Sequence, residues 1–239
     1  MFQRRYVHLM EEIGDVTPPP PKVTATPNGP YQVTGIQRII WREVVETPEG
    51  EPIAWRERGV IAESDGEYWL CRCGHSANKP FCDGSHRRVG FVAEDAAEPG
   101  PRSERATSYG EGQVTLQDDR SLCVHTGFCA NKVTNAWKLA ARDDLDTPGT
   151  TQLVAMAQHC PSGAISVSAD AADIEPALPA EVVLVPDGPL WVTGSVAVER
   201  SDGVSLESRN RVTLCRCGAS KNKPLCDGSH TETGFAHHP

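Results

Sequence analysis

The sequence predicts an α+β protein built from two copies of a small β-rich module, with a separate α+β unit inserted between them. The first observation is a repeat: CRCGHSANKPFCDGSHRRVGF at 71–91 recurs as CRCGASKNKPLCDGSHTETGF at 215–235, with 15 identities in 21 positions. The second is that PNGPYQVTG at 27–35 is echoed by PDGPLWVTG at 186–194, so each copy begins well before its cysteines. The third is the different pattern between the copies, which combines strand and helix signals.

The composition of the whole chain excludes several classes of protein. Its 239 residues include 23 Lys and Arg against 32 Asp and Glu, a formal net charge of -9, so we expect neither nucleic acid nor a membrane as partner. No apolar run approaches the roughly 20 residues of a spanning helix, and the first residues lack a signal-peptide pattern, which predicts a cytoplasmic protein. The nine cysteines fall in three clusters, which favours metal ligation over a disulfide framework.

The repeat and the proline-rich stretch TPPPPK divide the chain into four predicted parts. They are an N-terminal arm with its proline linker at 1–25, the first module at 26–95, the inserted domain at 107–170 and the second module at 180–239. Consecutive prolines cannot donate backbone hydrogen bonds and favour an extended spacer. We therefore expect the arm to stand apart from the modules unless it docks on them.

Each module is predicted to consist of short strands followed by a metal-binding loop. Val192, Val196 and Val198 alternate with polar residues, which is the pattern of a half-buried strand. Between the PNGP segment and the first cysteine the first copy is fifteen residues longer than the second, and the extra stretch contains a charged loop at Glu43–Arg58. This difference predicts that the two copies are functionally unequal.

The inserted unit is predicted to contain strands and two helices. A strand begins at Val114, and 136–142 has a helix-forming composition. Thr150 or Thr151 is expected to cap a second helix that ends at Cys160, after which AISVS forms another strand.

The chemistry of the modules is predicted by one spacing, which is C-x-C, eight residues, C, three residues and H. The first set is Cys71, Cys73, Cys82 and His86, and the second set is Cys215, Cys217, Cys226 and His230. Zinc knuckles normally use C-x2-C, from which C-x-C departs. In a two-iron cluster each iron needs two protein ligands, so the C-x-C pair would hold one iron and the later cysteine and histidine the other. Asp83 is expected to cap a helix that sets this later pair one turn apart.

These residues resemble the CDGSH iron-sulfur, or NEET, domain family, whose pattern is C-x-C-x2-S/T-x3-P-x-C-D-G-S/A/T-H. Both copies meet every position of it, including Ser76 and Pro80 in the first and Ser220 and Pro224 in the second. The resemblance implies one 2Fe-2S cluster in each copy, with electron-transfer or cluster-transfer activity. It also implies that the modules pair about a pseudo-two-fold axis within one chain, giving a monomer, although the inserted domain is long enough to permit a swapped dimer.

Histidine ligation has two consequences. A neutral imidazole in place of a thiolate removes one negative charge and raises the reduction potential. Because a protonated ring nitrogen cannot ligate, His86 and His230 are predicted to be the labile ligands in mild acid. The alternative is a structural zinc ion in each module, which the C-x-C spacing opposes.

The middle cysteines form a third predicted site. DDRSLCVHTGFC with the later HCPSGAI resembles a divergent, single-cluster 4Fe-4S ferredoxin, with Cys123, Cys129 and Cys160 as ligands. Thr126 stands where the second cysteine is expected, which implies a 3Fe-4S cluster, or a 4Fe-4S cluster whose fourth iron takes water, hydroxide or His125. Zinc bound by the three cysteines and His125 or His159 is the alternative.

We therefore expect an electron carrier rather than an enzyme, with an external reductase or oxidase as redox partner. No nucleotide loop, hydrolytic triad or flavin fingerprint is present in the sequence. The second hypothesis is a cluster donor or a redox or pH sensor that passes 2Fe-2S to an apo-acceptor, and the third is a structural interaction protein stapled by zinc. His237 and His238 in the tail are expected to be frayed and to have no role.

Overall fold

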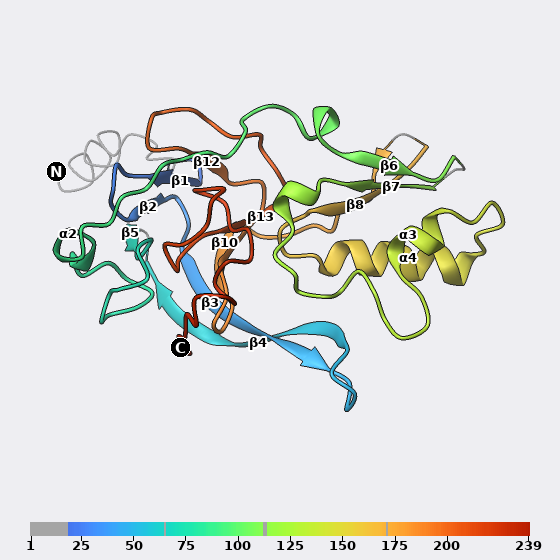
Figure 1. The fold of residues 1–239 in the computed structure, drawn as a ribbon, viewed down its shortest axis with the longest axis horizontal. Helices are drawn as coiled ribbons and strands as arrows, with labels where there is room; N and C mark the ends of the chain where they lie inside the picture. The colour runs from blue at the N-terminus through green and yellow to red at the C-terminus, as the bar shows by residue number, and fades with distance from the viewer. Residues whose placement is uncertain (1–18, 65, 112–113, 171) are drawn as a thin grey trace, which may run out of the picture.

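The computed structural model describes residues 19–64, 66–111, 114–170 and 172–239, and most of the predicted arm lies outside them. The described residues form a mostly β structure with few helices (Figure 1). The two modules lie at one end of the molecule, and the inserted domain with its two longer helices lies at the other (Figure 1). The described residues contain no helix that is long and apolar enough to cross a membrane.

The first sheet combines strands of both modules. Its order is β12-β1-β2-β5. The strands are β1 (Lys22–Ala25), β2 (Tyr31–Thr34), β5 (Glu67–Leu70) and β12 (Ala197–Glu199). β2 and β5 come from the first module, and β1 is the end of the predicted arm at 1–25, which thus packs against that module as an antiparallel neighbour of β2. β12 comes from the second module and pairs with β1 in parallel.

The second sheet has the same composition with the modules exchanged. Its order is β13-β11-β10-β3-β4. The strands are β10 (Glu181–Leu184), β11 (Leu190–Thr193), β13 (Arg211–Leu214), β3 (Arg38–Glu46) and β4 (Pro52–Glu63). Here β10 of the second module pairs in parallel with β3 of the first. The second module thus gives β12 to the first sheet, and the first module gives β3 and β4 to the second sheet, where β4 has no counterpart in the first sheet.

One hydrophobic core joins the two modules. It includes Val23 from β1 and Ile39 from the first module together with Leu184 and Val192 from the second, all at most 2 % exposed. Burial of one such side chain stabilises a fold by about 1.5 to 3 kcal/mol. Separation of the modules would therefore expose the core and break the parallel pairings at once.

The longer stretch of the first copy is a β-hairpin, so the expectation of a charged loop at Glu43–Arg58 is wrong. β3 and β4 pair along their whole length with three irregularities in register. The charges are there, but they pair across the hairpin, as Glu43 does with Arg58 at 2.5 Å. Residues that alternate with the charged ones, such as Trp55, point inward and pack against buried hydrophobic side chains. The charges alone do not predict these strands.

The inserted domain has a four-stranded antiparallel sheet and its own core. The sheet order is β6-β7-β8-β9. The strands are β6 (Thr107–Tyr109), β7 (Val114–Asp118), β8 (Ile165–Ala169) and β9 (Ala172–Asp173). The helices are α3 (Ala136–Ala140) and α4 (Thr147–His159), with short 3-10 turns η1 (Arg102–Glu104) and η2 (Arg120–Leu122). The predicted strands and helices are confirmed, with one difference in α4.

Helix α4 begins before the predicted cap at Thr150 or Thr151. Asp146 caps it, because its Oδ1 accepts a hydrogen bond from the amide of Gly149 at 2.9 Å. Proline at the first turn favours this start as well, since it needs no hydrogen-bond acceptor there. The predicted end is confirmed, because the helix stops at His159 directly before Cys160.

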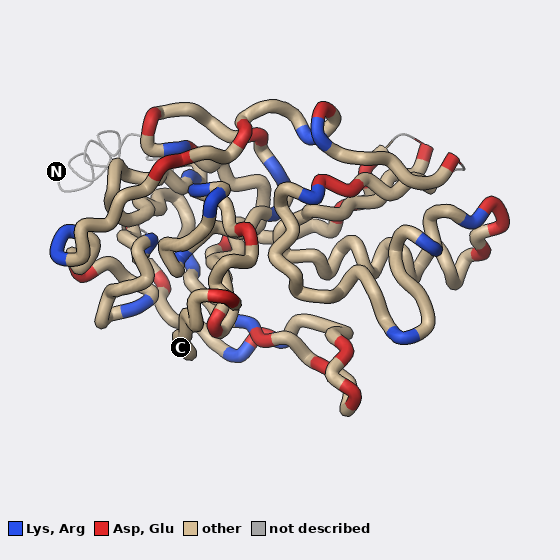
Figure 2. The backbone as a smooth tube through the Cα atoms, in the orientation of Figure 1, with Lys and Arg blue, Asp and Glu red and all other residues tan. Residues whose placement is uncertain are grey.

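Positions of Lys and Arg and positions of Asp and Glu are spread along the backbone throughout the described chain (Figure 2). A concentration of basic residues occurs at α2 (Ser85–Arg88), the short helix that follows the second half of the first metal loop.

Candidate metal centres

The first candidate centre lies in a loop that begins directly after β5. Two backbone hydrogen bonds close this loop: the amide of Cys71 donates to the carbonyl of Pro80, and that of Cys82 donates to the carbonyl of Trp69, both at 2.7 Å. In the second module the corresponding bonds, from Cys215 to Pro224 and from Cys226 to Thr213, are both 2.9 Å long. The strands therefore hold the cysteines of each set close together before any metal binds.

Within each set the ligand atoms come together in two pairs. The Sγ atoms of Cys71 and Cys73 are 3.8 Å apart, and Sγ of Cys82 lies 3.4 Å from Nδ1 of His86. The matching distances are 3.8 Å for Cys215 with Cys217 and 3.4 Å for Cys226 with His230. The predicted one-turn approach of cysteine and histidine is thus present in both modules.

This paired geometry fits a two-metal cluster better than a single metal ion. Two ligands at about 2.3 Å from one tetrahedral metal lie roughly 3.7 Å apart, which is close to the separations within each pair. A single zinc ion would need all four ligands around one point. Among the residues that the structure describes, no three His, Cys, Asp or Glu side chains converge in that way. The donor set of three sulfurs and one imidazole nitrogen therefore suits the cluster predicted from the spacing.

Backbone amides point at the sulfurs of both loops. The amide of His75 lies 3.5 Å from Sγ of Cys73, and that of Gly84 lies 3.4 Å from Sγ of Cys82. Ala219 and Gly228 take these places in the second module, both at 3.5 Å. Such amides stabilise negative charge on a thiolate or on a cluster.

The role predicted for Asp83 as a helix cap is wrong. Helix α2 has only four residues, and the residue at its N-cap position is Gly84, with φ of 83°, and not Asp83. The helix has no side-chain cap. The carboxylate instead accepts hydrogen bonds from the amides of Ala77 at 2.8 Å and Ser85 at 2.9 Å, which ties the two halves of the loop together. These bonds lower the pKa of Asp83. The second module has turns in place of α2, so no helix dipole acts there.

The thiols of each C-x-C pair share a proton. A hydrogen bond from the Cys73 thiol lowers the pKa of Cys71 to about 6, whereas the pKa of Cys73 is raised. In the second module the hydrogen bond from Cys215 lowers the pKa of Cys217 to about 7, and the pKa of Cys215 is raised by that same bond and by burial. One thiolate is thus accessible near neutral pH in each pair, as metal binding requires.

The two metal loops touch each other. A Cβ atom placed on Gly74 would lie 2.5 Å from the carbonyl oxygen of Cys217, and one placed on Gly218 would lie 2.7 Å from that of Cys73. Both glycines also have positive φ. Only glycine permits so close a backbone approach, and the contact is reciprocal between the modules.

Tyr31 breaks the equivalence of the modules. Its hydroxyl donates to the carbonyls of Cys215 at 2.8 Å and Pro224 at 2.9 Å, so a first-module side chain holds the second-module loop. The aligned position of the second module is Leu190, which has no hydroxyl to return the bond. Burial raises the pKa of Tyr31, so its hydroxyl keeps the proton that it donates. Sequence reasoning missed this residue, although the Tyr31/Leu190 mismatch in the aligned repeat was a visible signal.

The third candidate centre is a cavity of about 180 Å³ in the inserted domain. Cys123, Cys129 and Cys160 all line it, together with Thr126 and His125. Burial and the two neighbouring cysteines raise the pKa of Cys129. The three predicted cysteines thus line one cavity, although no three described His, Cys, Asp or Glu side chains converge on one metal position.

Of the two histidines considered for the third centre, only His125 lines the cavity. Its Nδ1 lies 4.0 Å from Sγ of Cys123. His159 points elsewhere: its Nδ1 lies 2.7 Å from the carbonyl oxygen of Ala155, and its ring stacks on Phe128 at 5.3 Å between centroids. A zinc site completed by His159 is therefore not supported.

The tail histidines are ordered, contrary to expectation. His237 exchanges two hydrogen bonds with Asp187, and its Nδ1 lies 2.7 Å from a guanidinium nitrogen of Arg216. His238 contacts the same carboxylate at 2.7 Å. The tail thereby closes over the turn that starts the second module.

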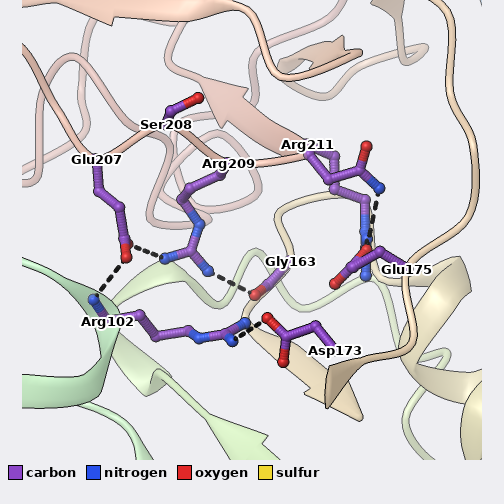
Figure 3. Close-up of a pocket in the computed structure, with 9 residues that line it drawn as sticks. Arg102, Gly163, Asp173, Glu175, Glu207, Ser208, Arg209 and Arg211 are labelled. Atoms are coloured by element: carbon purple, nitrogen blue, oxygen red, sulfur yellow. Dashed lines mark hydrogen bonds and ion pairs between the residues drawn. The ribbon is translucent and has the colours of Figure 1, made fainter. Parts of the chain in front are cut away.

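A second, polar cavity of about 130 Å³ lies between the inserted domain and the second module. Figure 3 shows three arginines in it, each beside a carboxylate. The pairs are Arg102 with Asp173 at 3.1 Å, Arg209 with Glu207 at 3.0 Å, and Arg211 with Glu175. Since the charges are already paired, we interpret this cavity as a docking contact between domains and not as an anion site.

Two loops with paired cysteine and histidine ligands, next to a three-cysteine cavity, define a metal protein of the iron-sulfur class. The family model described as Iron-binding zinc finger CDGSH type matches residues 28–87 and 187–231. The model described as Divergent 4Fe-4S mono-cluster matches residues 109–170. The chain is therefore an iron-sulfur protein with two CDGSH-type segments and a divergent 4Fe-4S domain inserted between them. No curated protein matches it.

Proposed function

We propose that this protein is an electron carrier with two 2Fe-2S clusters and one 3Fe-4S or 4Fe-4S cluster. The first 2Fe-2S cluster would be held by Cys71, Cys73, Cys82 and His86, and the second by Cys215, Cys217, Cys226 and His230. Cys123, Cys129 and Cys160 would hold the larger cluster. The redox partner would be an external reductase or oxidase.

One observation carries the proposal: the three ligand loops are in contact in a fixed order. His125 of the inserted domain lies against Gly228 in the second CDGSH loop, since a Cβ on this glycine would be 2.9 Å from the imidazole Cδ2. The second loop in turn meets the first through Gly74 and Gly218. Such an order suits stepwise movement of single electrons, whereas a structural staple needs no contact between its metal loops.

The reciprocal strand pairing supports an intramolecular pseudo-dimer as the architecture of the CDGSH part. The pairing of β1 with β12 repeats as that of β10 with β3, and both are parallel. A ferredoxin-like fold for the inserted domain is supported by its antiparallel sheet with α3 and α4 packed in one core. This arrangement would keep all three clusters in one rigid body.

The ligands set the expected direction of electron flow. Histidine in place of one thiolate raises the potential of a 2Fe-2S cluster, whereas ferredoxin clusters ligated by cysteine have low potentials. Electrons would therefore pass from the inserted domain to the CDGSH pair. No substrate-binding machinery is needed for this role, so we regard the protein as a carrier and not as an enzyme.

The first test is a count of iron, zinc and acid-labile sulfide per chain in protein purified without oxygen. Two 2Fe-2S clusters and one larger cluster require about 7 to 8 irons and about 8 sulfides. About three zinc ions without sulfide would establish the structural alternative instead.

A second candidate function is donation of a 2Fe-2S cluster to an apo-acceptor, favoured by the half-buried position of Cys82 and His86. The double variant His86→Cys/His230→Cys separates the two functions. A carrier should still take up electrons from dithionite and, after the excess dithionite has been removed, return them to ferricyanide, at a lowered potential. A donor should lose transfer to an apo-ferredoxin because four thiolates hold the cluster more firmly. Unchanged transfer to the apo-ferredoxin would exclude the donor model with labile histidine.

A further inference from the structure

The two CDGSH loops have nearly the same sequence but different surroundings. Cys226 is only 2 % exposed and Gly228 is buried, whereas Cys82 and Gly84 are half-buried. Leu225 is buried as well, whereas its counterpart Phe81 is half-buried. The cysteine and glycine near the histidine are thus more covered in the second module than in the first, whereas His86 and His230 are both half-buried.

The cover over the second loop is the inserted domain. The ring of His125 occupies the space beside Gly228, and the side-chain amide of Asn222 donates to the carbonyl of Ser121 at 3.0 Å. In contrast, a Cβ on Gly84 would meet nothing within 4 Å. Asn78, the counterpart of Asn222, is exposed.

The segments that follow the metal loops do not explain the difference, because each of them covers the loop of the other module. The carbonyl of Lys223 accepts hydrogen bonds from Ala96 and Ala97, which follow the first metal loop. On the first loop, the side chain of His237, which follows the second metal loop, makes a hydrogen bond with the backbone of Lys79. The tail of each module therefore covers the lysine side of the other. Among the described residues, the coverings of the second loop without a counterpart on the first are the inserted domain and the Tyr31 hydroxyl, which bonds the carbonyls of Cys215 and Pro224.

The open rim of the first loop also differs in chemistry. Helix α2 places Arg87 and Arg88 on the surface, and Val89 beyond it is 43 % exposed. The aligned residues of the second module are Thr231, Glu232 and Thr233. In a chain with a net charge of -9, this basic end stands out at the left of Figure 2. A partner with an acidic surface would be attracted here and repelled elsewhere.

We propose that the first CDGSH site, at Cys82 and His86, is the one that faces an external partner with an acidic surface, while the second site is an internal one capped by the inserted domain. The inference rests on the proposed iron-sulfur carrier and assigns different roles to its two similar sites. Single electrons would be exchanged between the first cluster and an external partner that is bound beside Arg87 and Arg88. The second site would exchange electrons only with its two neighbours inside the protein.

Removal of iron by chelators tests this assignment, because a chelator reaches an open site before a capped one. Anaerobic full-length His230→Cys protein keeps a three-cysteine, one-histidine cluster only at the first site, and His86→Cys protein keeps it only at the second. The electron paramagnetic resonance signal of that cluster, followed over time, gives the rate for each site. The probes are the dianionic bathophenanthroline disulfonate and the neutral 2,2'-bipyridine.

We expect the first site to lose iron severalfold faster than the second with both chelators. Asn222→Ala should speed loss from the second site by about fivefold, the effect of one hydrogen bond, and its matched control Asn78→Ala should not change the first. His125→Ala gives a second, independent opening of the cap. Arg87→Glu/Arg88→Glu should slow removal from the first site by the dianionic chelator, most clearly at low salt, without slowing the neutral one.

Equal rates at the two sites would overturn the inference, as would a second-site rate that neither Asn222→Ala nor His125→Ala changes. If Arg87→Glu/Arg88→Glu does not change the rate of iron removal by the dianionic chelator, the proposal that these arginines form the surface for an acidic partner is wrong. The chelation rates test the assignment of the two sites independently of the tests for electron transfer. Protein that loses iron unequally but, once reduced and freed of excess dithionite, returns no electrons to ferricyanide would disprove the carrier function and leave the assignment of the two sites intact.

Discussion

At the scale of single residues, Tyr31 gives the second metal loop a support that the first loop lacks. Tyr31→Phe removes the hydroxyl and leaves the carbonyls of Cys215 and Pro224 without this donor. Because the site is fully buried, we expect a loss of about 1 to 3 kcal/mol, seen as a fall in Tm by circular dichroism. The second cluster should also be lost faster than in the parent protein.

Tyr68→Phe is the matched control for this variant. The Tyr68 hydroxyl donates to the carbonyl of Gln37 at 2.7 Å, away from the second loop. The control should lower Tm without changing the loss of the second cluster. Equal effects of both variants on the second cluster would contradict the role of Tyr31.

The pH dependence of the clusters is also decided by single residues. Hydrogen bonds from the amides of Ala77 and Ser85 lower the pKa of Asp83 below its unfolded value. Its contribution is therefore present above the unfolded pKa of about 4 and is lost only as pH falls through the lower folded pKa. Between about pH 7 and pH 5 Asp83 stays ionised, so Asp83 does not cause cluster loss in that window, and we expect protonation of the histidine ligands to be the cause.

The double variant His86→Cys/His230→Cys should therefore keep its 2Fe-2S absorbance at pH values where the parent protein bleaches. Asp83→Asn should weaken cluster retention to a similar extent at both ends of the window. Visible absorbance at stepped pH measures both effects. Bleaching of the histidine double variant at the same pH as the parent would exclude histidine protonation as the cause.

The close approach of the candidate ligands within each pair could be predicted from the sequence, because the spacing of cysteine and histidine directly encodes a local loop. The pairs with short separations, such as Cys71 with Cys73, lie as predicted. The prediction for Asp83 was wrong because the same sequence pattern fits an aspartate that caps a helix and one that stabilises a turn. The left-handed conformation of Gly84 makes this segment a turn. The packing of His125 on Gly228 joins residues far apart in the chain, which no local pattern encodes.

At the scale of elements, the turn that ends each CDGSH motif differs in what covers it. Gly84 and Gly228 have φ of 83° and 89°, so alanine strains both by about 1 to 2 kcal/mol. Only at Gly228 does the new Cβ also meet His125, at 2.9 Å. We therefore expect Gly228→Ala to lower Tm and perturb its cluster signal more than Gly84→Ala does.

A comparison of Gly84→Ala, Gly228→Ala and the double variant His125→Ala/Gly228→Ala shows whether the clash with His125 causes the larger loss of Tm in Gly228→Ala. In the double variant His125→Ala/Gly228→Ala the added methyl group has room, so the additional loss of Tm should disappear and only the strain should remain. Persistence of the full loss in the double variant would mean that Gly228 is needed for a reason other than its contact with His125.

The elements themselves were predictable where hydrophobic pattern and length agreed, as for β7 and the end of α4. The β3–β4 hairpin was not recognised, because its charged residues pair with one another along one face while Trp55 packs on the other. The tryptophan ring lies 5.1 Å from that of Trp191 and 5.2 Å from that of Phe128, and its Nε1 donates to the carbonyl of His159 at 2.9 Å. The extra stretch of the first copy thus joins the second module to the inserted domain.

At the scale of the whole molecule, the exchange of strands was beyond sequence reasoning, since the pattern of a strand does not name its partner. β1 and β12 are separated by most of the chain, as their register of Lys22 with Ala197 shows. Sequence analysis predicted two modules that pair about an axis, but not that each sheet is completed by the other module. The exchange means that neither module has a complete sheet alone.

The same exchange predicts the oligomeric state. Both parallel pairings, the shared core and the contact of Gly74 with Cys217 are satisfied within one chain. We therefore expect a monomer of 25.9 kDa plus its clusters, with a mass that does not change on dilution. Light scattering during size-exclusion chromatography of anaerobic protein measures it. A dimer that dissociates only with loss of clusters would mean that the strands are exchanged between two chains, with the same contacts formed across the dimer.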